Sequence, residues 1–468
     1  MNRNNFLPHV ALAIVVILIA AFAGQVRKWQ KQHAHSEKRV EVVTTTVAQL
    51  ENHTAEVRTE SQAREGEVLV RFRAGTSPER IQSIVLRLND QVEDQIEAVS
   101  GLDVIEDEDG LDAESVAAEY RGLPEVEYAE PAYEIKIDSS FNPVLPNDER
   151  FAEQWALANT GQNGGKEGAD ISATFAWATT KGSDKVVVAV LDSGVDYTHS
   201  DLEHNIWKRP ENIKAYDDRD LGEIDDEYGF SAIDENRDPM DENGHGTHCA
   251  GIIGAEGGNN EGITGVNWNV KIMPLKFMDA SGAGTTADAI EAINYVIDRK
   301  QAGVNVRVIS ASWGSTQRSQ ALEDVIRKAG EAGILFVAAS GNSSVDTDRS
   351  PHYPSSYNLP NVISVAALDR NDALTSFSNF GAKTVHIAAP GKDILSTWLD
   401  NGFREASGTS MATPMVSGVA ALVLSRNPNL SAEELKRQLL DSTDKLPGLK
   451  GKVVTGGRIN AAKAVGAD

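Results

Sequence analysis

From about Pro143 to the C-terminus, short apolar runs alternate with longer amphipathic stretches. Continuous apolar runs of this length are typical of strands buried on both faces, and the stretches between them have helical periodicity. Strands that alternate with helices build a parallel sheet with helices on both sides. We therefore predict a doubly wound, mostly parallel α/β domain over residues 143–468. Its strands are expected at Val186–Leu191, Val270–Phe277, Val306–Ala311, Ile334–Ala339, Val362–Ala367 and Val385–Ala389, and its helices near 286–300, 317–332, 411–425 and 431–441.

A smaller unit is expected before this domain, over residues 66–138. Residues 68–72 alternate like a half-buried strand, whereas apolar residues between 81 and 88 recur with helical spacing. The order of the predicted elements fits a small α+β domain of the β-α-β-β-α-β, or split βαβ, type. Residues 25–65 are polar without a sustained apolar period, and we predict a linker there. The remaining elements of the small unit are a helix around 116–120 and strands at 102–105, 126–128 and 132–137.

The first residues carry the pattern of an export signal. Arg3 precedes an apolar run over residues 10–23, which ends in a small-x-small cleavage pattern. Three basic residues between 27 and 31 follow the run, and such a charge would also suit an uncleaved anchor. Residues 1–24 are therefore predicted to be a signal peptide or an anchor. A cleaved signal makes the protein secreted or periplasmic, whereas an anchor would tether it to the membrane through residues 10–23.

The charge and cysteine content exclude several classes of function. The net charge is −25, from 69 acidic against 44 basic residues, which argues against nucleic acid as a partner. The single cysteine, Cys249, excludes an intrachain disulfide and a metal site built from several thiolates.

The segment Gly408-Thr-Ser-Met-Ala-Thr-Pro414 places the hydroxyl of Ser410 at the head of an alanine-rich helix. A helix N-terminus offers unpaired N–H groups and a positive dipole end, which suit a nucleophile and the oxyanion that it creates. The alternative is that Thr409 or Ser410 only caps the helix. The remainder of the chain must decide, because a nucleophilic serine needs a base, a group that orients the base and a second oxyanion donor.

Three further polar residues supply these functions. Asp192 and Asn342 each follow a predicted buried strand, and His245 lies between two glycines that leave room for a substrate. A carboxylate can hold an imidazole in one tautomer, and an amide can donate to an oxyanion. Alone, Asn342 would more often be a turn residue, and Asp192 could equally well make a turn with Gly194. His245 and His248 could be taken for a metal-binding pair, but no further cysteine or His-Glu-x-x-His spacing supports zinc.

Together, four segments resemble the subtilisin-like serine peptidases, in the family's order of Asp, His and Ser. The resemblance covers about residues 143–465, and residues 66–138 resemble the family's inhibitory propeptide. The matching segments are Val-Leu-Asp-Ser-Gly-Val-Asp around Asp192, Gly-His-Gly-Thr-His-Cys-Ala-Gly around His245, Ala-Ala-Ser-Gly-Asn ending at Asn342, and Gly-Thr-Ser-Met-Ala-Thr-Pro around Ser410.

The resemblance implies a role for each of these residues. Ser410 is the expected nucleophile, His245 the general base and then acid, and Asp192 the group that orients His245. Asn342 and the backbone N–H of Ser410 are the expected oxyanion hole. The implied reaction is peptide-bond hydrolysis through an acyl-enzyme.

The resemblance also indicates substrate-binding and calcium-binding residues. The expected walls of the specificity pocket are Ser312, Trp313 and Gly314 on one side and Ala339, Ser340 and Gly341 on the other. Trp313 either narrows a neighbouring subsite or is a partly exposed indole without such a role. We expect apolar or aromatic residues before the cut. The expected ligands of one structural Ca²⁺ are Asp201, Gly257, Asn259, Glu261 and Ile263, and those of a possible second Ca²⁺ are Asp234, Asn236 and Asp238, where a solvated acidic loop is the alternative.

We therefore predict a secreted serine endopeptidase that is made as a zymogen. Its substrates are proteins or peptides, and its own propeptide is the expected intramolecular inhibitor, with residues 132–138 in the cleft. The alternatives are a membrane-tethered processing protease with few substrates and a catalytically silent relative that acts by binding.

Overall fold

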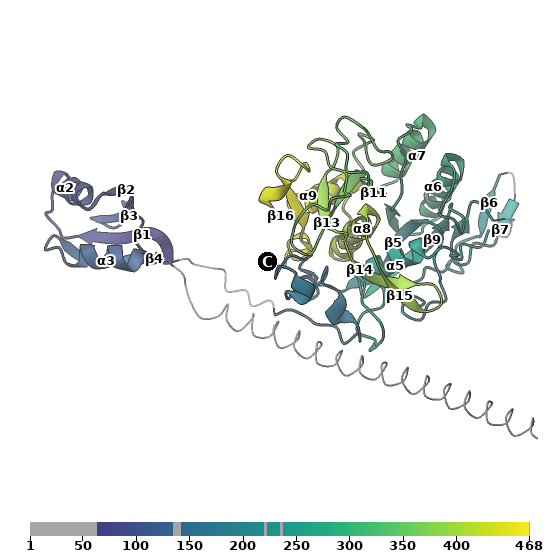
Figure 1. Ribbon diagram of the computed structural model, residues 1–468, viewed down its shortest axis with the longest axis horizontal. Helices are drawn as coiled ribbons and strands as arrows, with labels where there is room; N and C mark the ends of the chain where they lie inside the picture. Colours follow the sequence, from purple (N-terminus) through teal and green to yellow (C-terminus); the bar gives the residue numbers. More distant parts are fainter. Residues whose placement is uncertain (1–62, 134–141, 220–221, 235–236, 468) are drawn as a thin grey trace, which may run out of the picture. The chain divides into compact units, whose positions relative to one another are not determined.

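The structure is a computed structural model that describes residues 63–133, 142–219, 222–234 and 237–467 (Figure 1). It contains two compact units, one within residues 51–140 and one from residue 141 onward. The predicted signal or anchor, most of the predicted linker, the propeptide tail at 134–138 and Asn236 lie outside the described residues.

The small unit is a four-stranded antiparallel sheet, in the order β2-β3-β1-β4, with two helices. Val68, Val70 and Phe72 on β1 share one core with Ile84 and Tyr120 of the helices. The predicted β-α-β-β-α-β type is confirmed, although β2 was not foreseen because its sequence, DQVEDQ, is almost wholly polar. The separate strands predicted at 126–128 and 132–137 are wrong as far as they are described, because residues 126–133 form one strand, β4. The elements are β1 Ala63–Phe72, α2 Pro78–Leu88, β2 Asp90–Gln95, β3 Leu102–Asp107, α3 Ala113–Arg121 and β4 Val126–Tyr133.

The large unit contains a nine-stranded sheet in the order β16-β17-β13-β12-β11-β10-β5-β9-β8. Every neighbouring pair is parallel except β16 and β17, so the predicted mostly parallel sheet is confirmed. The strands are β5 Gly182–Asp192, β8 Phe230–Ser231, β9 Asn269–Lys276, β10 Val306–Ala311, β11 Leu335–Ala339, β12 Val362–Leu368, β13 Ile387–Pro390, β16 Thr443–Lys445 and β17 Gly457–Ile459.

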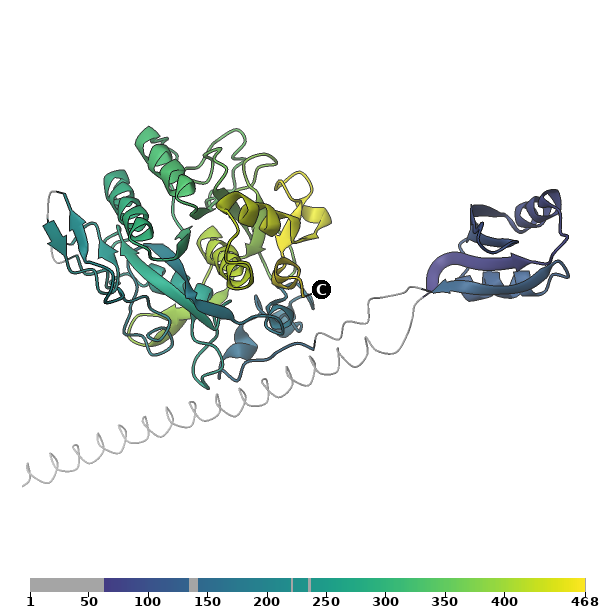
Figure 2. The ribbon, with the colours of Figure 1, turned by 180° about the vertical axis from the view of Figure 1, so that it is seen from behind.

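Helices cover both faces of this sheet, as the continuous apolar strands predict. Val186, Val188 and Val190 of β5 belong to a core with α5 and α8, whereas the alternate residues Val187 and Leu191 belong to a second core with α6 and α7. The helices α6 and α7 lie side by side on the second face (Figures 1 and 2). The helices are α4 Ala173–Ala176, α5 His245–Gly254, α6 Thr286–Gln301, α7 Gln320–Glu331, α8 Thr409–Arg426, α9 Ala432–Asp441 and α10 Ala461–Val465.

Two hairpins complete the large unit. Tyr216–Asp218 (β6) pairs with Gly222–Ile224 (β7), and Ile394–Trp398 (β14) pairs with Gly402–Ala406 (β15). The second hairpin packs against α5.

Candidate active site

Three neighbouring strands, β5, β10 and β11, end at one edge of the sheet, where the working residues of parallel α/β folds collect. β5 ends with Asp192, Ser312 follows the last residue of β10, and Asn342 lies three residues after β11. Two helices begin against this edge. His245 at the start of α5 contacts Asp192, and Thr409 at the start of α8 contacts Asn342.

A buried carboxylate orients the imidazole of His245. Asp192 is 1% exposed, and its Oδ1 lies 2.7 Å from Nδ1 of His245 and accepts from the backbone N–H of Ser193 at 2.8 Å. Because an ionised carboxylate only accepts, Nδ1 of His245 carries the proton, and Nε2 of the neutral ring keeps its lone pair. Gly246 permits this approach, since a Cβ at that position would lie 2.0 Å from the carbonyl oxygen of Gly194.

Ser410 lies in the first turn of α8, which begins at Thr409. Pro414 has no N–H, so the carbonyl of Ser410 lacks the donor that a regular helix would supply. The hydroxyl of Ser312 donates to this carbonyl at 2.8 Å, and the thiol of Cys249 donates to it at 3.5 Å. The hydroxyl of Ser410 donates in turn to the carbonyl of Ser312 at 3.0 Å. The proline therefore explains why Ser312 and Ser410 are held together.

Cys249 places the serine next to the Asp192–His245 pair. Its Sγ lies within 4.8 Å of possible ligand atoms of both residues. Burial raises the pKa of the Cys249 thiol, so the side chain remains protonated and acts as a small packing residue. Among the described residues, the hydroxyl of Ser410 is hydrogen-bonded to Ser312 and not to His245. A rotation about χ1 of Ser410 must therefore precede any proton transfer to His245.

Asn342 presents its amide nitrogen toward Ser410. Its Oδ1 accepts from the backbone N–H and from the hydroxyl of Thr409, both at 2.9 Å. A Cβ placed on Gly408 would lie 3.4 Å from Nδ2 of Asn342 and 3.5 Å from the backbone nitrogen of Ser410. Two N–H donors thus border one small space beside Gly408, which is the arrangement that stabilises an oxyanion.

Sequence reasoning missed Asp241, which holds the start of α5. Its side chain is 5% exposed and accepts from the hydroxyl of Ser193 at 2.9 Å. An aspartate shortly before a helix is a common capping signal and could have indicated this residue. Its backbone donors, at 2.9–3.0 Å, are the N–H groups of Asn243, Gly244 and Thr247.

His248 does not belong to the site formed by Asp192, His245 and Ser410. It is fully buried, and its Nε2 lies 3.1 Å and 2.9 Å from the carbonyl oxygens of Ile394 and Arg404 in the β14–β15 hairpin. Burial lowers the pKa of His248 to about 4, so the ring is neutral and anchors the hairpin to α5.

The residues predicted to wall the specificity pocket follow β10 and β11. The Trp313 indole donates to the carbonyl of Leu191 at 2.9 Å and packs against Phe277. Ser340 is fully buried, and its carbonyl accepts from the Asn379 side chain at 2.8 Å. Ala339 is also buried, whereas Gly314 and Gly341 add no side chain to either segment.

Residues 183–457 match the model of the subtilase family, Peptidase S8. The chain belongs to the subtilase family. Residues 49–132 match the fervidolysin N-terminal prodomain, so this subtilase carries a prodomain before its peptidase domain.

Curated relatives support the same assignment. The chain is 35% identical to a thermophilic serine proteinase of Bacillus sp. (strain AK1) over 86% of this chain and 87% of the relative. It is 36% identical to thermitase of Thermoactinomyces vulgaris over 63% of this chain and 93% of thermitase. A solved protease of Pseudoalteromonas arctica PAMC 21717 superposes with a TM-score of 0.57 at 27% identity, over 69% of this chain and 99% of that chain.

The subtilase is a serine endopeptidase, and the hypothesis of a catalytically silent relative is wrong, because its relatives are proteases. No helix in the described part of the chain has the length and apolarity needed to cross a membrane. The apolar run at residues 10–23 lies outside that part.

Replacing Asp241 by asparagine should shift the pH dependence of this subtilase. Burial opposes charge on His245, but the attraction of Asp192 outweighs it and Asp241 adds to that attraction, so the pKa of His245 is raised. Catalysis needs the neutral ring, and activity should therefore fall as the pH drops through this raised pKa. Asp241→Asn removes one attraction, so the acid limb of kcat/KM should move to lower pH.

Asp241→Asn also weakens the hydrogen bonds that fix the start of α5, where His245 lies. We expect kcat to fall about tenfold, because a hydrogen bond to a charged group contributes about 1.5 kcal/mol. Steady-state kinetics from pH 5 to 9 measures both effects. Glu242→Gln, one residue further on, serves as a control because the Glu242 side chain is 63% exposed. An acid limb at the wild-type position in Asp241→Asn would contradict this role.

The predicted ligands of the first calcium ion lie around a buried carboxylate in this subtilase. Asp201 is 0% exposed and accepts from Asn259 Nδ2 and from the backbone N–H of Ile263, both at 2.9 Å. The side chain of Glu261 is exposed, and its backbone N–H donates to Oδ1 of Asn259. Gly257 packs closely, since a Cβ there would lie 2.4 Å from Oγ1 of Thr264.

Asp148 also faces the loop 257–263 and was missed from the sequence. It is 4% exposed, its Oδ2 accepts from the backbone N–H of Gly258 at 2.8 Å, and its Oδ1 has no hydrogen-bond partner among the described residues. Burial raises the pKa of Asp148 to about 6 and that of Asp201 to about 7, and the charge of Glu256 raises both further. The site therefore brings together acidic groups whose negative charge is disfavoured by burial and by mutual repulsion.

The second acidic loop has a basic partner. The ammonium of Lys276, which is 3% exposed, lies 2.9 Å from Asp234 and 2.9 Å from Glu242. Asp238 accepts from the hydroxyl of Tyr197 at 3.2 Å. The Lys276 charge therefore lies where the sequence suggested a second Ca²⁺, and binding of that ion stays a prediction.

Proposed function

We propose that this subtilase is exported as a zymogen and hydrolyses peptide bonds with Ser410 as nucleophile. The observation that carries the proposal is the 2.7 Å contact between Asp192 and His245 at the sheet edge where Ser410 begins a helix. Asn342 Nδ2 and the backbone N–H of Ser410 border one space there, which supports their role as the oxyanion hole.

The proposed reaction starts when the Ser410 hydroxyl rotates from the Ser312 carbonyl toward His245. Oγ attacks the scissile carbonyl carbon while Nε2 of His245 takes its proton, and Asp192 stabilises the resulting imidazolium. The carbonyl oxygen becomes negative in the space beside Gly408. His245 then gives the proton to the leaving amine, which departs and leaves an acyl-serine. Water, deprotonated by His245, hydrolyses that ester.

A fluorophosphonate probe tests this assignment. It should label the mature enzyme at a single serine, and peptide mass spectrometry should place the label on Ser410, because only an activated hydroxyl reacts. Excess probe with no label on Ser410, or with label spread over other serines, would refute the assignment.

We also propose that the small unit keeps the enzyme inactive until it is removed, with residues 132–138 in the substrate cleft. The match to a prodomain over residues 49–132 supports this reading. Residues 1–24 would act as the export signal, with a retained anchor as the alternative. N-terminal sequencing of the Ser410→Ala precursor, which should keep its prodomain, separates the two, since an anchored form would keep Met1 or Arg3.

The residues around Asp201 fit a structural Ca²⁺. Hard oxygen ligands suit this ion, and Asp148 Oδ1 and Asp201 supply buried carboxylate oxygens. The Asn259 amide and backbone carbonyls of the loop 257–263 would complete the set. A bound Ca²⁺ would neutralise the buried charge and hold this loop against residue 148.

Excess chelator is expected to lower the thermal midpoint of the enzyme. Calcium at a hundred times its Kd stabilises a protein by about 2.7 kcal/mol, and a chelator removes that contribution. Calorimetry should use Ser410→Ala protein, so that self-digestion does not contribute. Asp201→Asn should melt near the chelated midpoint with or without chelator. Equal midpoints of the parent protein in calcium and in chelator would contradict the site.

A further inference from the structure

A surface groove with an apolar floor and a basic rim lies in the loop that joins β16 to β17, in the yellow part of the chain in Figure 1. The loop encloses a cavity of about 490 Å³. Val454 is 49% exposed there, and the side chains of Lys445 and Lys450 are exposed beside it. We call this cavity the lysine groove, and it is lined mainly by Lys445, Leu446, Pro447, Lys450, Val453 and Val454.

The lysine groove is fixed by the contacts beneath it. Val453 is 2% exposed and packs in one apolar cluster with Val385, which precedes β13. The backbone N–H of Val454 donates to the carbonyl of Val385 at 2.8 Å, and the N–H of Leu446 donates to the carbonyl of Gly456 at 3.0 Å. The exposed side chain of Val454 therefore belongs to a folded loop, and it cannot turn inward without breaking these contacts.

The rim of the groove carries positive charge that no acidic group neutralises. Residues 445–467 contain five basic and no acidic residues, although acidic residues outnumber basic ones by 69 to 44 in the whole chain. Two of the five, Arg458 and Lys463, form ion pairs with Asp444. Lys445 and Lys450 form none among the described residues, and the ammonium of Lys445 has only neutral oxygen partners. A basic rim of this kind favours an anionic ligand.

The apolar floor narrows the class of anion. Nucleic acids and acidic polysaccharides bring negative charge but no aliphatic side chain to cover Val454, whereas an acidic polypeptide segment can bring both. Charges more than about 8 Å away are largely screened at physiological ionic strength, so the net charge of −25 does not cancel the attraction of the two nearby lysines. The groove therefore suits carboxylates on either side of an aliphatic side chain.

The lysine groove and the proposed catalytic residues lie at opposite edges of the main sheet. The groove lies where β16 ends and β17 begins, and β17 runs parallel to β13 and to the strands beyond it. It is therefore at the edge where the parallel strands begin, whereas Asp192, Ser312 and Asn342 are at the edge where their strands end. A partner in the groove would leave the catalytic edge free.

We propose that the lysine groove is a docking surface for an acidic segment of a partner protein. Carboxylates of the segment pair with Lys445 and Lys450, and an aliphatic side chain between them covers Val454. The proposal goes beyond the proposed function, because binding at this edge of the sheet does not require Ser410 to be the nucleophile.

The test measures binding of a short dye-labelled peptide, in which leucine recurs among glutamates, to full-length Ser410→Ala protein by fluorescence anisotropy. Reversing both charges, with Lys445→Glu and Lys450→Glu together, should weaken binding about tenfold or more, because two attractions become repulsions. Val454→Ser should weaken it about fivefold through the lost apolar contact. The matched control is Lys185→Glu with Lys214→Glu, which changes the net charge equally at two exposed lysines outside the groove and should leave the affinity unchanged.

Lys445→Gln with Lys450→Gln replaces the reversed pair if that pair lowers the thermal midpoint, and it should weaken binding about threefold. Absence of binding to the parent protein, unchanged affinity in the groove variants, or an equal loss in the control would overturn the proposal. A glutamate peptide without leucine, or an oligonucleotide, that binds as tightly as the leucine-containing peptide would also overturn it, because general attraction of lysines for anions would then suffice.

Discussion

Replacing Ser410 by alanine is expected to lower kcat by roughly 10⁵-fold, because the variant has no hydroxyl to form the acyl-enzyme. The oxyanion hole and the substrate contacts remain, so KM should change little, and residual hydrolysis would come from water activated by His245. Hydrolysis of casein and of peptide p-nitroanilides measures the loss. Mass spectrometry of the same protein should find the segment before residue 142 still attached if the enzyme removes its own prodomain.

Ser407→Ala is the matched control for this variant. Ser407 is exposed, three residues before Ser410, and its hydroxyl contacts only Asp393 among the described residues. It should keep turnover within about twofold of wild type, because surface substitutions away from a site are usually almost neutral. Ser410→Ala protein that digests casein at the wild-type rate would show that another group is the nucleophile.

The main sheet was predictable because its strands are buried on both faces. Such strands are continuously apolar, and the alternate residues of β5 enter two different cores. Prediction from continuous apolar runs fails for strands that have one solvent-exposed face or only a few residues. The polar β2, the partly exposed β15 and the three-residue β16 and β17 gave no apolar run to detect.

The four motif residues were predictable because each follows a strand or begins a helix, where sequence order limits position. Asp241 and Asp148 were missed for a different reason. Their importance depends on what folds against them: the start of α5 for Asp241 and the loop 257–263 for Asp148. These are contacts between distant segments, and local periodicity does not encode them.

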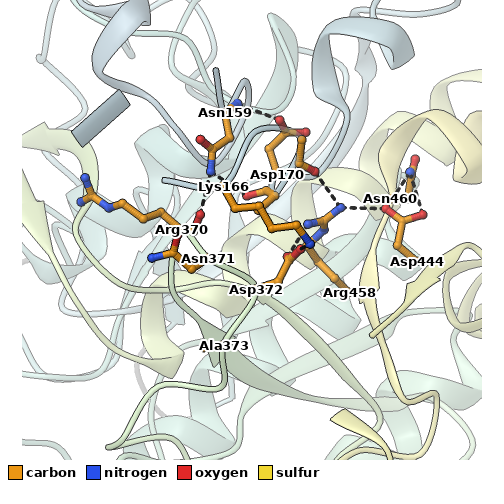
Figure 3. Close-up of polar contacts among 12 residues, drawn as sticks. Asn159, Lys166, Asp170, Arg370, Asn371, Asp372, Ala373, Asp444, Arg458 and Asn460 are labelled. Atoms are coloured by element: carbon orange, nitrogen blue, oxygen red, sulfur yellow. Dashed lines mark hydrogen bonds and ion pairs between the residues drawn. The ribbon is translucent and has the colours of Figure 1, made fainter. Parts of the chain in front are cut away.

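Replacing Arg458 by methionine should destabilise the peptidase domain by about 3 kcal/mol, because it removes the buried cation from Asp372 and Asp444. These carboxylates would keep only the more exposed Lys166 and Lys463 as cationic partners. Arg458 is 4% exposed, and its guanidinium contacts Asp372 and, at 2.8 Å, Asp444 (Figure 3). It also donates to the carbonyl of Gly168 at 3.1 Å. The residue therefore joins an early segment, the loop after β12 and the C-terminal strands.

The loss should depend on pH because of Asp170, which is 8% exposed. Burial raises its pKa to about 6, and the nearby Arg458 acts in the opposite direction. A raised folded-state pKa means that stability falls as the pH rises from the unfolded value through the folded one. Removal of Arg458 raises this pKa further, so the deficit of the variant should be larger at pH 8 than at pH 5.

Denaturant unfolding of Arg458→Met at both pH values, in Ser410→Ala protein, measures the deficit. Arg327→Met is the matched control, since Arg327 is 42% exposed and its ion pairs with Glu323 and Asp324 lie on the surface of α7. Such pairs contribute about 0.5 kcal/mol or less. Equal losses for the two variants would mean that the Arg458 charges are effectively solvated, and a deficit that shrinks from pH 5 to pH 8 would exclude Asp170 as the pH-dependent group. The outcome expected from burial is a large, pH-dependent loss for Arg458 and a small, pH-independent one for Arg327.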